Sequence, residues 1–163
     1  MTPVATSDLC DRFGEEAQVC RAPLKVYGGS STASGRIACL RCFEDAALLR
    51  SQLEQVGDGR ILVVDGGASE RVAIFGDNMA QLAIENGWAG VIIYGAVRDV
   101  ERLGSMQLVV LALGHVPVRS GRSGLGQWEV ELAIGGAVFR PGHYICIDRD
   151  GVVVLPNPPL GNP

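Results

Sequence analysis

Two short segments of this chain carry residue types that could hold a small organic acid beside a metal ion. Gly76-Asp77-Asn78-Met79 precedes a helical pattern, and Arg98-Asp99 follows a run of aliphatic residues. Free amide groups and the positive dipole end at a helix start attract an anion. The planar guanidinium of Arg98 suits a carboxylate. The carboxylate of Asp99 is the hard oxygen ligand that Mg²⁺ or Mn²⁺ prefers.

This combination would fit a small 2-oxo acid that chelates a divalent ion, with the ion acting as an electron sink for an enolate. An aldolase that works through a Schiff base would instead need a lysine in the pocket. Lys25 is the sole lysine among 14 basic residues and lies outside both segments. A metal route is therefore favoured if the protein is an aldolase. Taken alone, a helix cap at 76–79 and a local ion pair at 98–99 are the commoner interpretations.

Runs of aliphatic residues should form the sheet that positions these segments. Residues 61–64, 91–94 and 108–113 are typical of strands covered on both faces, and 36–43 also favours a strand. Both candidate segments lie in loops that follow such strands, where open α/β sheets usually bind ligands. Helices are expected over 6–13, from Glu44-Asp45 to Val56, over 79–86, and from about 100 to Leu103.

The last third of the chain is predicted to be rich in β structure. Residues 127–134 alternate apolar and polar side chains, and Gly135-Gly136 indicates a tight turn. Short strands are expected at 138–139, 144–147 and 152–155. We expect one α/β domain over residues 1–163 with an added β layer, and a proline-rich surface tail at 156–163.

Composition narrows the class of protein. The 163 residues are 47% hydrophobic, which is enough for one core, and the net charge is −4. This acidic balance argues against a nucleic-acid binder that works through basic patches. There is no run of 18 apolar residues and no signal-peptide pattern, so we expect a cytoplasmic protein without a membrane partner.

The five cysteines are expected to be reduced and structural. Five is an odd number, and no secretion signal accompanies them. Cys39 and Cys42 form a CxxC pair, but in a strand these positions face opposite sides. No second CxxC or histidine pair completes a zinc set. Buried thiols are favoured over redox or zinc chemistry.

One spacing, together with several flanking motifs, resembles a known family. Asp77 is followed by 20 residues and then by Arg98-Asp99. The flanking motifs are Ser7-Asp-Leu-Cys-Asp11, Cys42-Phe-Glu-Asp45, Arg60-Ile-Leu-Val-Val-Asp-Gly-Gly67, Asn86-Gly-Trp-Ala-Gly90, Tyr94-Gly-Ala-Val-Arg-Asp99 and Asp148-Arg-Asp-Gly-Val152. From about Thr6 to Leu155 the chain resembles the RraA-like family. That family includes the regulator of ribonuclease E activity A and the class II 4-hydroxy-4-methyl-2-oxoglutarate aldolases.

The resemblance implies a fold, an assembly and a reaction. The fold would be a three-layer β/β/α domain of the swivelling type, assembled as a homotrimer with sites near the subunit interfaces. The reaction would be metal-dependent cleavage of 4-hydroxy-4-methyl-2-oxoglutarate to two pyruvates. Oxaloacetate decarboxylation would use the same pyruvate enolate.

The resemblance also implies roles for single residues. Asp99 would bind Mg²⁺ or Mn²⁺, mostly alongside waters and the substrate. Arg98 would hold the substrate and stabilise the enolate oxygen. The backbone of Gly76-Asp77-Asn78-Met79 would bind the carboxylate of the pyruvate moiety, and Asp77 would orient a metal-bound water that relays protons.

Two other functions stay open. The same resemblance would fit a protein that binds ribonuclease E and inhibits it without catalysis, and the acidic charge suits a basic partner region. Methyl transfer in quinone synthesis has low weight, because no Gly-x-Gly-x-x-Gly opens a helix after the first strand.

Overall fold

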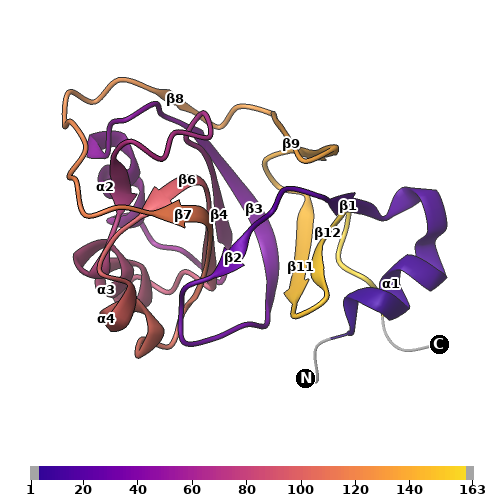
Figure 1. Cartoon of the computed structure of the whole chain (residues 1–163). Helices are drawn as coiled ribbons and strands as arrows, with labels where there is room; N and C mark the ends of the chain where they lie inside the picture. The colour runs from indigo at the N-terminus through magenta and orange to yellow at the C-terminus, as the bar shows by residue number, and fades with distance from the viewer. Residues whose placement is uncertain (1–3, 161–163) are drawn as a thin grey trace.

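The computed structural model describes residues 4–160 and arranges them in three layers (Figure 1). Helices α2, α3 and α4 lie on one side of a central sheet, and a second β layer lies on the other. The helices are α1 (Thr6–Phe13), the 3-10 turn η1 (Gly14–Glu16), α2 (Ala47–Leu53), α3 (Asp77–Glu85) and α4 (Val100–Gly104). The predicted α/β class and its three-layer arrangement are confirmed.

The central layer is a parallel sheet whose strands agree with the aliphatic runs. Its strands are β3 (Ala33–Arg41), β4 (Ile61–Asp65), β6 (Gly90–Val97) and β7 (Val109–His115), adjacent in that order. The side chains from Ile61 to Val64 are fully buried because both faces of the sheet are covered. One face packs against α2, α3 and α4, and the other faces the second β layer.

Strand β3 joins the two layers. Its first residues, Ala33–Arg36, pair antiparallel with β11, whereas residues 37–41 pair parallel with β4. The sheet therefore curls along β3 into an antiparallel end. The remaining strands are β1 (Gln18–Cys20), β2 (Lys25–Val26), β5 (Ala73–Phe75), β8 (Gln127–Trp128), β9 (Leu132–Ile134), β10 (Ala137–Phe139), β11 (Tyr144–Asp148) and β12 (Gly151–Leu155). Helix α1 packs on the outer face of β11 and β12.

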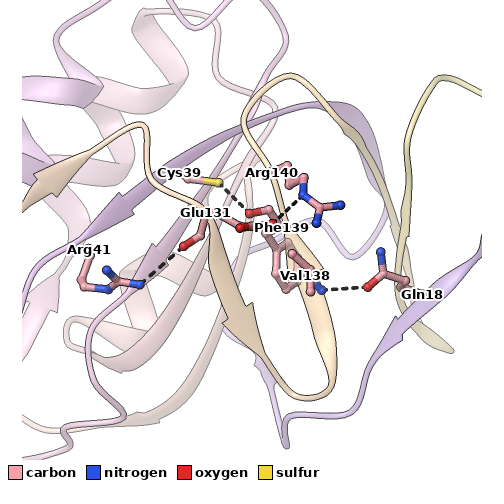
Figure 2. Close-up of polar contacts among 7 residues, drawn as sticks. All are labelled: Gln18, Cys39, Arg41, Glu131, Val138, Phe139 and Arg140. Carbon is pink, nitrogen blue, oxygen red and sulfur yellow. Dashed lines mark hydrogen bonds and ion pairs between the residues drawn. The ribbon is translucent and has the colours of Figure 1, made fainter.

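The β9–β10 hairpin is fastened to the sheet by polar contacts from three directions (Figure 2). The side-chain oxygen of Gln18 accepts a hydrogen bond from the Val138 amide at 2.9 Å. The thiol of Cys39 donates to the Phe139 carbonyl, and the Arg41 guanidinium donates to the Glu131 carbonyl, each at 3.5 Å. The hairpin thereby covers the face of the sheet that lies opposite the helices.

Several boundaries differ from the sequence-based expectation. The helix expected from Glu44 begins at Ala47, because Glu44 takes a left-handed backbone (φ +52°) that a helix cannot include. The single strand expected over 127–134 is two short strands, β8 and β9, that pair with different partners. Strands β1, β2 and β5 are only two or three residues long, so tertiary pairing rather than local pattern defines them.

The cysteines behave as the strand pattern predicts. Cys39 is packed between the sheet and the second β layer, whereas Cys42 is packed on the helix side. Both thiols are buried, and burial raises each pKa to about 12. Over the described part of the chain the five cysteines are all free, so the expectation of structural thiols is confirmed for the CxxC pair.

Within residues 4–160, no helix is both long enough and apolar enough to cross a membrane.

Candidate functional site

A β-α-β unit brings the two candidate segments together. Strand β5 lies parallel to the end of β6, with Ala73 opposite Ala96 and Phe75 opposite Val97. The residues that follow each strand must therefore emerge side by side. The 20 residues between Asp77 and Arg98 hold most of α3 and all of β6. The connection from β5 to β6, residues 76–89, is long enough for the helical crossover that parallel strands need.

Direct hydrogen bonds join the two segments. The Arg98 amide donates to the Phe75 carbonyl at 2.9 Å, and the Asp77 amide donates to Oδ2 of Asp99 at 3.1 Å. Gly76 lies between them: a Cβ there would come within 2.6 Å of Asp99 Oδ2 and 3.3 Å of Arg98 Cγ. The backbone of Gly76 is extended (φ −153°), so glycine here leaves space for the Asp99 side chain and is not needed for its dihedral angle.

Asp99 holds an unusual backbone conformation. Its φ of +61° lies in the left-handed region, which residues other than glycine seldom enter, although aspartate tolerates it better than most. Asp99 lies between the end of β6 and the start of α4, and its carboxylate faces the first turn of α3, where it accepts from the Asp77 amide. Strain of this kind clusters at functional sites, and here it sits on the predicted metal ligand.

All six predicted site residues line one pocket. The pocket wall includes Gly76, Asp77, Asn78, Met79, Arg98 and Asp99. Its charged side chains are four arginines and two aspartates, so this pocket is cationic in a chain whose net charge is negative. Among the described residues, no acid or carbonyl pairs with the Arg98 guanidinium. The arrangement favours an anionic ligand.

The start of α3 is partly occupied by the protein's own carboxylates. Asp99 accepts from the Asp77 amide, and Asp77 Oδ1 accepts from the Asn78 amide at 2.8 Å. The other oxygen of Asp77 pairs with Arg102 Nε at 3.0 Å. The Met79 amide has no partner among residues 4–160. A ligand carboxylate could reach Met79 directly, but it reaches the Asp77 amide only after the Asp99 side chain turns away.

The acids present fit a hydrated divalent cation better than an all-protein cage. No group of three or more Cys, His, Asp or Glu side chains in the described region could enclose a metal. Asp77 and Asp99 are the acids among the pocket's lining residues. Mg²⁺ is commonly held by one or two carboxylates together with water and substrate oxygens. Asp99 and Asp77 are therefore acids of the kind that could hold such an ion.

Sequence reasoning missed a third loop that lines the pocket. Arg119, Ser120 and Arg122 belong to the loop that follows β7, and Arg50 comes from α2. The rule that ligands bind at the carboxyl ends of parallel strands applies to β7 as well. The run Val118-Arg-Ser-Gly-Arg122 after that strand was the available signal.

Asp45 also has a larger role than a helix-start acid. Its carboxylate accepts from the Ala47 amide at 3.1 Å, and also from the Ser123 amide and hydroxyl, each at 2.6 Å. Burial alone would raise the pKa of Asp45, but these hydrogen bonds outweigh it and the pKa lies below its ordinary value. Asp45 therefore stays ionised and ties the start of α2 to the loop after β7.

Comparison with known proteins places the chain in a family. The family model described as RraA-like, Aldolase/RraA, matches residues 6–154. The protein with this fold and this cationic pocket is therefore of the aldolase and RraA class. The chain belongs to the RraA-like family, as its resemblance predicts.

Individual relatives carry different names. A protein of Laribacter hongkongensis named "Putative 4-hydroxy-4-methyl-2-oxoglutarate aldolase" is 44% identical over 155 residues, which are 95% of this chain and 98% of that protein. The RNA-processing inhibitor RraA from Thermus thermophilis superposes with a TM-score of 0.94 at 42% identity, covering 98% of this chain and 97% of that one. A structure from Geobacillus kaustophilus called S-adenosylmethionine: 2-dimethylmenaquinone methyltransferase also reaches 0.94, at 47% identity, covering 98% and 99%.

These three names describe three activities on one fold. Overall similarity therefore does not choose among them, and the choice depends on the side chains of the pocket.

Proposed function

We propose that this protein is a lyase that cleaves the C3–C4 bond of a 2-oxo acid, with a divalent cation as cofactor. The observation that supports this most directly is the pocket in which Arg98, Asp99 and the start of α3 meet. The name of the Laribacter hongkongensis relative points to the same class of reaction. We propose 4-hydroxy-4-methyl-2-oxoglutarate and oxaloacetate as the substrates.

Arg98 would bind and orient the substrate. Arg98 is half-buried, and its guanidinium carries no ion pair within the described chain. It could donate two hydrogen bonds, one to the substrate carboxylate and one to the 2-oxo oxygen. The hydrogen bond to that oxygen strengthens as negative charge develops on it, so it stabilises the transition state more than the ground state.

Asp99 would hold the cation, Mg²⁺ or Mn²⁺, with water and substrate oxygens as the remaining ligands. When bound, the cation supplies a Lewis acid that withdraws electron density from the 2-oxo group. Asp77 would hold the water that takes and returns protons, and Arg102 keeps its carboxylate in place. The Met79 amide would complete the carboxylate site, and the Asp77 amide would join it once the Asp99 side chain turns away.

Both reactions break a bond to C3 and pass through pyruvate enolate. In the aldol cleavage, the C4 hydroxyl loses its proton, the C3–C4 bond breaks, and C4 becomes the carbonyl carbon of one pyruvate. In the decarboxylation, the C3–C4 bond breaks and C4 leaves as carbon dioxide. In each case the bonding electrons remain on the enolate, and C3 then takes a proton to give pyruvate.

The test is pyruvate release from each substrate, with Mg²⁺ or Mn²⁺ and with a chelator, against a blank without protein. Wild type should release pyruvate, and the chelator should stop it. Asp99→Asn and Arg98→Gln should each lower the rate by about 100-fold or more. Arg149→Gln is the control, since Arg149 is exposed on the turn between β11 and β12. No release above the blank by wild type, or an undiminished rate in Asp99→Asn, would refute the proposal.

A second candidate function is inhibition of ribonuclease E by direct binding. The observation that favours it is the close superposition on a structure described as an RNA-processing inhibitor. The test is capture of ribonuclease E by wild type and by Asp99→Asn. Equal capture by both proteins, with no turnover by either, would favour regulation. Lack of capture would exclude it. We also propose the homotrimer that the family resemblance implies, which sedimentation would test.

A further inference from the structure

Backbone hydrogen bonds hold the loop after β7 on two sides, so the backbone positions of its arginines are fixed. On one side it meets β5: the Ala73 amide donates to the Val118 carbonyl at 2.7 Å, and the Ser120 amide donates to the Ala73 carbonyl at 3.2 Å. On the other side it meets the segment before α2. There the Gly121 amide donates to the Glu44 carbonyl, and the Ala46 amide donates to the Gly121 carbonyl, each at 3.0 Å.

The Asp45 carboxylate completes this anchorage. It lies 4% exposed, and within the loop it accepts hydrogen bonds from Ser123 and from the Gly124 amide. If the loop moved away, the buried Asp45 carboxylate would lose these hydrogen bonds at a considerable cost in free energy. The loop and the segment before α2 therefore behave as one unit. Three residues of this anchored loop, Arg119, Ser120 and Arg122, line the pocket.

The two loop arginines are available to a ligand. Arg119 and Arg122 are exposed, both line the pocket that Arg98 lines, and neither is paired with an acid in the part of the chain described. Arg98 follows β6, whereas the loop arginines follow β7, the neighbouring strand. The pocket therefore has cationic groups on two separate loops.

We propose that Arg119 and Arg122 form a subsite for the carboxylate at the far end of a dicarboxylic 2-oxo acid, and that Asp45 positions them. This inference rests on the proposed function, since it assigns the 2-oxo acid end of the ligand to Arg98. Guanidinium groups recognise carboxylates through charge-assisted hydrogen bonds, and two of them give a strong preference for a second negative charge. The subsite makes the protein selective for dicarboxylates over monocarboxylates of the same length.

The subsite should affect the two proposed reactions differently. In 4-hydroxy-4-methyl-2-oxoglutarate the far carboxylate survives cleavage as the carboxylate of the second pyruvate, so its contacts persist throughout. In oxaloacetate the far carboxylate loses its charge as it becomes carbon dioxide. Contacts to it are therefore stronger in the ground state than in the transition state and do not accelerate decarboxylation.

Binding of ligands that cannot be cleaved tests the subsite without any turnover. Calorimetry in Mg²⁺ would compare 2-oxoglutarate with 2-oxopentanoate, which has the same carbon chain but lacks the far carboxylate, and with pyruvate. Wild type should bind 2-oxoglutarate at least about tenfold more tightly than 2-oxopentanoate. The Arg119→Gln/Arg122→Gln variant should lose most of this ratio and keep its pyruvate affinity. Arg149→Gln should retain the full ratio.

Asp45→Asn tests the positioning role. The amide presents a donor where Ser123 and Gly124 also donate, so the loop should shift and the ligand ratio should fall, with the pyruvate affinity unchanged. If Asp45 had only a structural role, Asp45→Asn would lower the melting temperature without changing the ratio of affinities for 2-oxoglutarate and 2-oxopentanoate. In turnover assays, the double arginine variant should raise KM for 4-hydroxy-4-methyl-2-oxoglutarate without lowering kcat for oxaloacetate.

Each outcome decides the matter. A wild-type ratio below about twofold, or a double variant that keeps more than half of the wild-type ratio, overturns the subsite. Absence of turnover with an intact, arginine-dependent ratio would refute the lyase proposal and leave the subsite standing. Pyruvate release by a protein that binds 2-oxoglutarate and 2-oxopentanoate equally well would support the lyase proposal and refute the subsite.

Discussion

Gly76 is the residue on whose size the candidate site depends. It lies where the start of α3 meets Arg98 and Asp99, and its lack of a side chain lets the Asp77 amide reach the Asp99 carboxylate. Because its backbone is extended, alanine could adopt the same dihedral angles. Any effect of replacing Gly76 with alanine would therefore come from displacement of the Arg98 and Asp99 side chains.

We predict that Gly76→Ala lowers pyruvate release by at least about tenfold while the protein still folds, because misplacement of a substrate-binding group by about 1 Å is costly. The measurement is the pyruvate assay together with a thermal unfolding curve. Gly104→Ala is the matched control, since a Cβ at Gly104 meets nothing closer than 3.9 Å. A rate that is the same in both variants would contradict a role for Gly76 in placing Arg98 and Asp99.

At the scale of single elements, α1 depends on a cap from the far end of the chain. Its own N-cap residue, Ala5, has no side chain that can accept a hydrogen bond. Asp148, at the end of β11, supplies the cap: its carboxylate accepts from the Thr6 amide at 2.8 Å and from the Thr6 hydroxyl at 2.6 Å. Helix α1 is therefore fastened to the sheet by a contact that no local pattern contains.

We predict that Asp148→Asn destabilises the protein by about 1 kcal/mol at pH 7, as loss of a helix cap does. Burial raises the pKa of Asp148, but the hydrogen bonds from Thr6, Asp150 and Gly151 lower it more, so it lies below its ordinary value. A lowered folded-state pKa gives stability that is present at neutral pH and lost as the pH falls below about 4.

Urea unfolding of wild type and Asp148→Asn at pH 7 and near pH 3.5 would check this, with the difference expected to shrink in acid. Asp150→Asn is the control, because Asp150 is exposed and only its amide takes part in this network. A difference that grows in acid would contradict the assigned cap.

At the scale of the whole molecule, the sheet separates two large cores. One lies between the sheet and the helices, the other between the sheet and the second β layer. Cys39 and Cys42 belong to different cores, and Cys146 lies in a smaller third one beneath α1. Burial raises the pKa of Cys146 to about 11, so it too remains a thiol at neutral pH.

We predict that a colorimetric disulfide reagent at about pH 8 modifies one thiol quickly in the folded protein and all five after unfolding. The fast one should be Cys10, which is half-buried, whereas the other four are buried. Cys10→Ser should remove the fast phase. Fast reaction of Cys39 or Cys42 would show that the cores are more open than described.

Much of the site could be anticipated because its residues follow buried strands. The expectation that Asp77 and Arg98-Asp99 lie in loops at one edge of the sheet rests on the strands at 61–64 and 91–94. The strand that directly precedes Asp77 is β5, which the sequence did not predict. The rule that ligands bind at the carboxyl ends of parallel strands, applied to β7, would have found Arg119 and Arg122. The Asp45 contacts had no such signal, because their partners lie 78 and 79 residues away in a loop without periodicity.

The sequence by itself determined the family, the positions of the long buried strands along the chain and the chemical types that follow them. These features are local, since apolar runs and turn residues act over a few positions. Only the tertiary structure decided which carboxylates cap α1 and α3, and which loop brings extra cations to the pocket. Such contacts join residues far apart in the chain, and their formation depends on the packing of whole layers.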